Sequence, residues 1–408
     1  MAAENEQTVR RRRVFYIPGY DPIHPRRYRE LYRKESADQA QISGYSISLK
    51  QKTTKGNYGW SVDAEIDGVQ VDAQVEVMVW SDIVRTSMSN SILATYGQLV
   101  QTAWVYIASG ALWRLMKLRK GPVIAALYPV GMLLLQLLIA VLAGWVVFTV
   151  LTYFGGPFWF KGIVAACGVF IGWSVLKWFK RQDGKFFAYY LMHDYAYGAA
   201  TLGEYSPALE SRMADFGEVI AAALKSDVDE VLVVGHSSGA HLGVSILADL
   251  VRAGLVPKKG PDLGFLTLGQ VVPMVSFLRD AHRLRDDLRY LSQRDELTWV
   301  DVTAPGDGCA FALCDPVSVS GVAPEGKKWP LVFSAAFTQS LSPARWKELR
   351  WRFFRLHFQY LCAFDAPKDY DYFQITAGPL TLADRYAHRP ASKSRILKPV
   401  NKFTSTAS

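Results

Sequence analysis

The residues best suited to chemistry lie in one glycine-flanked serine motif, Gly235-His-Ser-Ser-Gly239. The motif directly follows the apolar run Glu230–Val234, and a helical segment is expected to begin at Ser238. A sharp turn between a strand and a helix exposes a serine hydroxyl, and it needs small residues on both sides because strand and helix approach closely. We therefore predict that Ser237 is a nucleophile. Without that role, the motif is an ordinary glycine-rich loop.

A serine nucleophile needs a histidine base and a carboxylate that orients the histidine. Asp307 lies a few residues after a predicted strand at Leu297–Thr303, and Asp315 lies eight residues later in an Asp-Pro-Val sequence. Two histidines come after these acids: His357, in an aromatic-rich segment, and His388, at the edge of a polar tail. Asp307 and Asp315 are therefore the candidate acids, and His357 is a better candidate base than His388, because a fixed geometry is not expected at the edge of a tail. Either aspartate can instead form a turn, because both stand beside glycine or proline.

With this motif and this order of residues, the chain resembles the α/β-hydrolase superfamily, and its lipase-like branches in particular. The resemblance implies that Ser237 is the nucleophile and that the backbone N–H of Ser238 forms part of an oxyanion hole. It assigns the second N–H to Gly19 or Tyr20, in the loop after an early strand. It implies the order serine, acid, histidine, which the pair His193-Asp194 does not follow. Because acids of this superfamily stand just after such a strand, the resemblance favours Asp307 as the acid, with Asp315 as the alternative, and it favours His357 as the base. It implies no metal and no organic cofactor.

The elements that must position these residues alternate between strands and helices in the C-terminal half. This alternation predicts an α/β fold with a mainly parallel sheet and helices on both faces. In the N-terminal half, residues 60–80 alternate apolar and polar around Asp67-Gly68, which indicates a β-hairpin. We expect four parts, namely an N-terminal part of the hydrolase domain (1–120), a transmembrane helical hairpin (121–180), the C-terminal part of that domain (181–389) and a disordered basic tail (390–408).

The hairpin is predicted from an uncharged stretch of 40 residues between Lys120 and Lys161. About 20 apolar residues cross a bilayer, and residues 130–153 and 157–179 each meet that length. Lysines and arginines flank both segments on the side away from the intervening turn, and positively charged flanks stay in the cytoplasm. We therefore expect an integral, multi-pass membrane protein whose catalytic domain faces the cytoplasm. The uncharged residues 86–113 form a third candidate span, although their many polar residues favour an interfacial or groove-lining helix.

The charge and the cysteine content of the chain bear on which partners and cofactors it can bind. The chain has 46 basic and 37 acidic residues among 408, a net charge of +9, and half of its residues are hydrophobic. No nucleic-acid recognition motif accompanies the basic runs, so we expect attraction to an anionic lipid surface rather than nucleic acid. The four cysteines show no metal-ligand spacing. The prediction is a membrane-anchored serine hydrolase that cleaves a hydrophobic acyl ester. The alternative is a hydrolase-like membrane protein that acts as a binding or scaffold module without catalysis.

Overall fold

The computed structural model describes residues 8–52, 56–88, 91–153 and 155–407. Within these residues the chain forms an eight-stranded sheet in the order β2-β3-β4-β1-β5-β6-β7-β8. The β2-β3 and β3-β4 pairs are antiparallel and the other pairs are parallel, so the predicted α/β class with a mainly parallel sheet is confirmed. The strands are β1 (Arg11–Ile17), β2 (Ser46–Gln51), β3 (Gly59–Ile66), β4 (Val69–Val77), β5 (Glu230–His236), β6 (Asp262–Leu268), β7 (Thr298–Thr303) and β8 (Leu331–Ser334).

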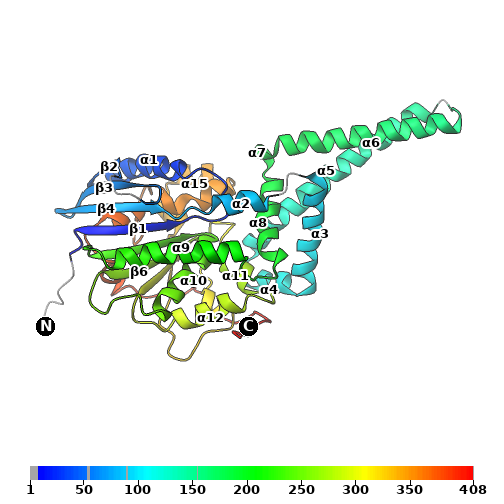
Figure 1. Cartoon of the computed structure of the whole chain (residues 1–408). Coiled ribbons are helices and arrows are strands. Elements are labelled where there is room, and N and C mark those ends of the chain that lie inside the picture. The colour runs from blue at the N-terminus through cyan, green and yellow to red at the C-terminus, as the bar shows by residue number, and fades with distance from the viewer. Residues whose placement is uncertain (1–7, 53–55, 89–90, 154, 408) are drawn as a thin grey trace.

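Helices cover both faces of this sheet (Figure 1). One face packs against α1 and the C-terminal helices α15 to α18, and the other packs against α9, α10 and α12. The helices are α1 (Arg26–Ser43), α2 (Ser81–Ser87), α3 (Ile92–Ala108), α4 (Ala111–Leu118), α5 (Lys120–Thr152), α6 (Phe158–Arg181), α7 (Asp183–Phe186), α8 (Ala188–Ala200), α9 (Pro207–Leu224), α10 (Gly239–Arg252), α11 (Val272–Ser276), α12 (His282–Leu291), α13 (Pro316–Val319), α14 (Phe337–Ser340), α15 (Pro343–Leu349), α16 (Phe353–His357), the one-turn 3₁₀ helix η1 (Gln359–Leu361), α17 (Tyr372–Ala377) and α18 (Leu382–Tyr386).

Strand β5 lies in the interior of the sheet, between β1 and β6. Every residue of β5 is buried, as expected for a parallel strand that is covered on both faces. The predicted hairpin at residues 60–80 is confirmed as β3 and β4, which pair from Gly59 with Glu76 to Ile66 with Val69. Asp67 and Gly68 both adopt positive φ angles, of 54° and 75°, as a two-residue hairpin turn requires.

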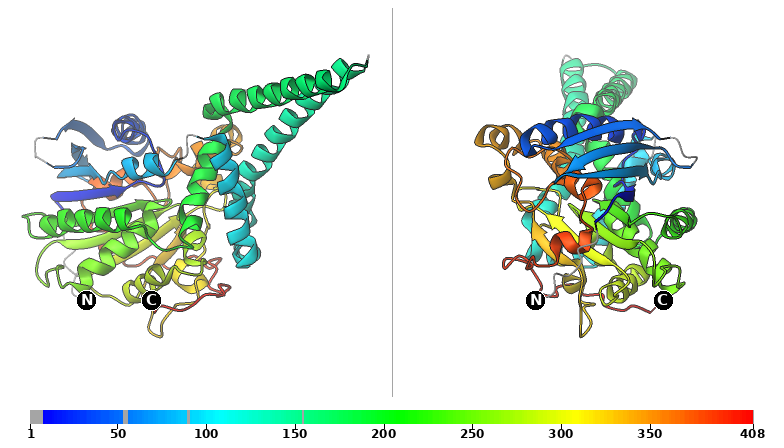
Figure 2. Two further views of the ribbon diagram at one scale, coloured as in Figure 1. Left: turned by 45° about the vertical axis from the view of Figure 1, so that its right-hand side comes forward. Right: turned by 90° about the vertical axis from the view of Figure 1, so that its left-hand side faces the viewer.

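Helices α5 and α6 form a hairpin that extends away from the body of the molecule (Figures 1 and 2). Among the described residues, these two helices are long and apolar enough to cross a membrane. Only 22% and 17% of their most apolar windows are buried, which distinguishes them from the core helices of a soluble protein. They pack through small residues: a Cβ atom on Gly144 would lie 2.7 Å from the Gly168 carbonyl oxygen, and one on Gly172 would lie 2.9 Å from that of Ala140. Such close contacts are typical of helix pairs in membranes.

A layer of helices joins the hairpin to the body, and it includes α3, α4 and α8 (Figure 1). Helix α3 falls in the uncharged segment 86–113, and it packs along α8. Tyr106 of α3 is buried and donates a hydrogen bond to the Met274 carbonyl oxygen at 2.9 Å, so this part of the segment lies against the body of the molecule. Other α3 side chains, among them Leu93 and Trp104, stay exposed.

The C-terminal tail differs from the expected disorder. Ile396 forms backbone hydrogen bonds with Leu313 and Asp315, and Ser392 donates one to Val332. The side chain of Asn401 donates to the Ser276 carbonyl oxygen at 2.9 Å. The tail is polar in composition, but its few apolar residues pack on the body and its backbone pairs with loops there.

Candidate active site

Ser237 stands at the turn between the central strand β5 and helix α10, with a φ angle of +56°. A positive φ is costly for any residue with a Cβ atom, and such strain persists where the surrounding structure enforces it. The Ser237 N–H donates to the Leu268 carbonyl oxygen at 2.9 Å, and the Ser237 carbonyl accepts from Ala240 at 3.1 Å. These bonds hold the turn from both sides, so the serine occupies the sharp strand-to-helix turn that the sequence predicts.

The two glycines of the motif are required by close packing. A Cβ atom on Gly235 would lie 2.7 Å from the Gly239 carbonyl oxygen, and one on Gly239 would overlap the backbone of Ile17. Any larger residue would therefore push α10 away from β5 and β1. This is the steric reason for the spacing of glycines around the serine.

The loop after β1 lies directly against Ser237. A Cβ atom on Gly19 would lie 2.9 Å from the Ser237 Cβ atom, so only glycine allows this approach. The Trp80 indole N–H donates to the Pro18 carbonyl oxygen at 2.9 Å, and the Tyr20 hydroxyl is 2.7 Å from the Ser87 hydroxyl. Among the described residues, the N–H groups of Tyr20 and Ser238 have no hydrogen-bond partner. The predicted oxyanion residues therefore border the serine, with their N–H groups unengaged.

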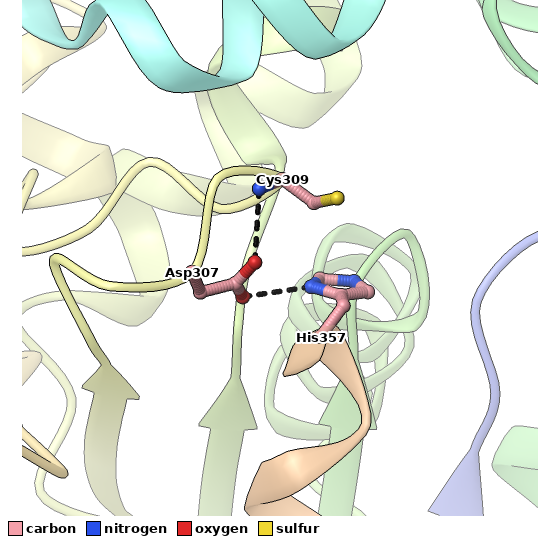
Figure 3. Close-up of side chains that lie close together, drawn as sticks. All are labelled: Asp307, Cys309 and His357. Atoms are coloured by element: carbon pink, nitrogen blue, oxygen red, sulfur yellow. Dashed lines mark hydrogen bonds and ion pairs between the residues drawn. The ribbon is translucent and has the colours of Figure 1, made fainter. Parts of the chain in front are cut away.

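His357 and Asp307 form a buried pair (Figure 3). The His357 Nδ1 atom lies 2.8 Å from Asp307 Oδ2, which leaves Nε2 for another partner. Asp307 also accepts hydrogen bonds from the Tyr360 hydroxyl at 3.1 Å and from the Cys309 N–H at 2.9 Å. Burial alone would raise the pKa of Asp307, but the charge of His357 and these hydrogen bonds lower it below its ordinary value. Asp307 therefore stays ionised beside the imidazole.

The alternative acid and the alternative base lie in other surroundings. Asp315 caps α13 by accepting hydrogen bonds from the Val317 and Ser318 N–H groups, and it forms an ion pair with Lys327. Its carboxylate thus has structural partners of its own. His388 follows α18 and is exposed. Neither Asp315 nor His388 is brought to the pair formed by His357 and Asp307.

His236, the residue before the serine, contacts the segment that carries His357. Its Nε2 atom lies 3.0 Å from the His357 carbonyl oxygen, and its Nδ1 atom lies 3.3 Å from the Tyr16 hydroxyl. Burial, together with the charge of His357, lowers the pKa of His236 to about 3. The ring is therefore neutral, with Nε2–H donating to the carbonyl and Nδ1 accepting from the tyrosine.

Ser237, His357 and Gly19 all line one cavity of about 130 Å³. Helix α8 contributes one wall, Tyr106 comes from α3, and Pro122 comes from the first turn of α5. Gly121 packs on Gly308, so the base of the α5–α6 hairpin touches the loop that holds Asp307. The cavity thus lies between the sheet and the helices that carry the hairpin.

Three side chains at this site have the atom types of a metal centre. Ligand atoms of Asp307, Cys309 and His357 lie within 4.8 Å of one another. A metal would bind the Cys309 thiolate, but burial and then the charges of Asp307 and Asp194 raise the pKa of that thiol well above its ordinary value. His357 Nδ1 already faces Asp307. These contacts fit a hydrogen-bonded acid–base pair better than a metal site.

The chain was also compared with known protein families, curated proteins and solved structures. No protein-family model, no curated protein and no solved structure matches this chain. The residues themselves therefore carry the functional argument.

The sequence did not predict the roles of three residues at the site. Tyr360 supports Asp307, His236 holds the backbone of His357, and Asp194 of α8 lines the cavity. Tyr360 stands three residues after His357, but nothing in that spacing indicates a contact with Asp307. His236 and Asp194 are visible as titratable residues in the sequence, and only their long-range contacts reveal what they do.

Proposed function

We propose that this protein is a serine hydrolase that cleaves acyl esters through an acyl-enzyme intermediate. The observation that carries the proposal is that Ser237, held at a positive φ, and His357, paired with Asp307, line one cavity. In the proposed reaction His357 takes the Ser237 proton as the hydroxyl oxygen attacks the ester carbonyl carbon. The imidazolium then gives that proton to the departing alcohol. Water repeats the two steps and releases the acid.

The unengaged N–H groups of Ser238 and Tyr20 support an oxyanion hole beside the nucleophile. Such donors stabilise the negative charge that develops on the carbonyl oxygen, and losing one typically costs about 3–4 kcal/mol of barrier stabilisation. Asp307 keeps the His357 imidazole in the tautomer whose Nε2 accepts the serine proton.

The arrangement also supports the resemblance to the α/β-hydrolase superfamily. The nucleophile follows an interior parallel strand, the antiparallel strands stand at one edge, and the acid and the histidine come later in the chain. These are features of architecture, and the function rests on the site itself.

We further propose that α5 and α6 cross a membrane, so that the protein is an integral membrane protein with both halves of the body in the cytoplasm. Basic residues cluster where the hairpin joins the body, which is the distribution of cytoplasmic flanks. They are Arg114, Lys117, Arg119, Lys120, Lys177, Lys180, Arg181 and Lys185. Because the cavity lies beside the hairpin base, a hydrophobic acyl ester that partitions into the bilayer is the expected substrate.

Labelling with a fluorophosphonate tests the hydrolase directly, because this probe reacts with activated serines. Ser237→Ala should abolish both labelling and ester hydrolysis, with a loss of about 10⁶ in turnover. Ser238→Ala is the matched control, since it removes the neighbouring hydroxyl and keeps the backbone N–H. Wild-type labelling in the Ser237→Ala variant would show that another residue is the nucleophile. Absence of labelling and hydrolysis in the folded wild-type protein would favour the scaffold alternative.

A further inference from the structure

The cavity beside Ser237 is aromatic and acidic. Asp21, Asp194 and Glu204 line this cavity, and none of the described residues that line it is lysine or arginine. Aromatic side chains line the same cavity, among them Tyr20, Trp80, Tyr106, Tyr190 and Tyr195. A phosphate or a carboxylate on a substrate would therefore meet carboxylates and, among the described lining residues, no lysine or arginine.

Of these three carboxylates, that of Asp194 is the best placed to bind a ligand. Asp21 accepts hydrogen bonds from the Tyr28 hydroxyl at 2.6 Å and from the Ile23 N–H at 2.9 Å, and Glu204 is exposed to solvent. Asp194 is partly buried on α8, and its carboxylate has no hydrogen bond or ion pair among the described residues.

Burial without a partner makes the ionised form of Asp194 costly. Desolvation raises the pKa of Asp194 to about 7, although the charge of His357 opposes the rise. A cation placed beside Asp194 would supply the missing partner. The faces of tyrosine and tryptophan rings also attract cations, and the combination of rings with a carboxylate suits a substituted ammonium group.

We propose that this cavity selects esters that carry a positively charged, substituted ammonium group, which lies against Asp194 and the aromatic rings while the ester carbonyl reaches Ser237. This inference rests on the proposed function, and it names the substrate class of the same site. A cavity of about 130 Å³ is close in size to one that holds benzene, so it accommodates a trimethylammonium group. The cavity rejects esters with phosphate or carboxylate groups.

Three thioesters of equal acyl length test the proposal on the purified full-length protein. They are butyrylthiocholine, its neutral isostere S-(3,3-dimethylbutyl) thiobutyrate, and an analogue with a terminal carboxylate. We expect kcat/KM to fall at least tenfold from the cationic to the neutral substrate, and further for the anionic one. Asp194→Asn should remove most of the preference for the cation, measured as the ratio of kcat/KM for the cationic substrate to that for the neutral one. Glu218→Gln, which removes one exposed charge on α9 outside the cavity, is the matched control.

The preference should also depend on pH. It should grow as pH rises through about 7, because Asp194 becomes ionised. The charge of His357 acts on Asp194 and lowers its pKa. Burial raises the pKa of each of the other titratable groups around Asp194, and the charge of Asp194 adds to that rise; these groups are Cys309, Tyr20, Tyr106, Tyr190 and Tyr195. The chemical steps at Ser237 and His357 are common to the three substrates, so the ratio of their kcat/KM values reports the charge at Asp194.

A binding measurement separates failure of this inference from failure of the proposed function. The Ser237→Ala variant should bind butyrylcholine more tightly than the neutral isostere, and the added change Asp194→Asn should abolish that difference. Equal binding of the two ligands, or a cation preference that survives Asp194→Asn, would overturn the inference even if Ser237 is the nucleophile. If Ser237 does not react with fluorophosphonate while the binding preference holds, the cation site stands and the hydrolase proposal fails.

Discussion

The His236 Nε2 atom lies 3.0 Å from the His357 carbonyl oxygen, so the residue before the proposed nucleophile holds the backbone of the proposed base. The two residues are 121 positions apart, and they meet because β5 and α16 end at the same side of the cavity. The Tyr16 hydroxyl fixes the other nitrogen of His236. This contact ties the position of the imidazole to the turn that carries Ser237.

His236→Phe should lower kcat about 10- to 100-fold with little change in KM, because the His357 carbonyl loses its donor and the imidazole shifts from its working position. His236→Gln keeps an N–H donor and should restore much of the activity. Steady-state kinetics of both variants test this positioning role. Equal losses of kcat in the two variants, or a loss confined to KM, would contradict it.

Asp307→Asn should lower turnover by about 10⁴ and leave substrate binding intact, because the His357 imidazole is then held in the wrong tautomer. Asp315→Asn should leave turnover within about threefold and lower the melting temperature, because Asp315 caps α13 and pairs with Lys327. Kinetics and thermal unfolding of both variants distinguish these roles. The reverse pattern would make Asp315 the acid.

The protein should lose stability as pH falls below about 6.5. Burial lowers the pKa of His236 and of His241 to about 3, so the folded state keeps both rings neutral while the unfolded chain binds protons. Their full contribution is present above the unfolded pKa of about 6.5 and is lost progressively toward pH 3. At pH 5 the protonation of each of these histidines in the unfolded chain lowers the free energy of unfolding by about 2 kcal/mol.

The slope of the melting temperature against pH measures this effect between pH 5 and 7.5. His241→Gln should make that slope shallower, whereas the exposed His388→Gln should leave it unchanged. An unchanged slope in His241→Gln would show that His241 is not neutral in the folded protein.

The contact between α5 and α6 depends on glycine at position 168. Gly168→Val would force a side chain against the Gly144 carbonyl oxygen, and we expect a loss of about 1–3 kcal/mol in stability. Gly162→Val is the control on the same helix, because a Cβ atom there meets nothing within 4 Å. Thermal unfolding in detergent micelles compares the two variants. Equal effects would mean that the helices do not pack as described.

The topology of the hairpin can be tested with cysteines introduced one at a time into a variant in which alanine or serine replaces all four native cysteines, namely Cys167, Cys309, Cys314 and Cys362. In sealed, right-side-out vesicles an impermeant maleimide should label Phe158→Cys, at the exposed turn of the hairpin. It should label Glu65→Cys and Lys398→Cys, on the two halves of the body, only after lysis. Labelling of one half of the body before lysis would place the halves on opposite sides of the membrane, and Tyr20 could not then serve Ser237.

Sequence alone determined the features that depend on neighbouring residues. The turn at Ser237 follows from an apolar strand, two glycines and a helix start, all within about a dozen positions. The β3–β4 hairpin and the α5–α6 hairpin follow from periodicity, turn residues and the length of an uncharged run. These patterns act over short distances, so the sequence carries them directly.

Tertiary structure decided what depends on residues that are distant in the chain. Asp307 and Asp315 have similar turn-forming neighbours in the sequence. In the folded chain α16 brings His357 into hydrogen-bond contact with Asp307, whereas Asp315 forms an ion pair with Lys327. The tail from residue 390 looks unstructured by composition, yet it is held by backbone hydrogen bonds to loops far away in sequence. Asp194 lines the cavity because α8 packs across the end of the sheet. Contacts of this kind are selected by the packing of the whole chain, and no local pattern encodes which partner each side chain meets.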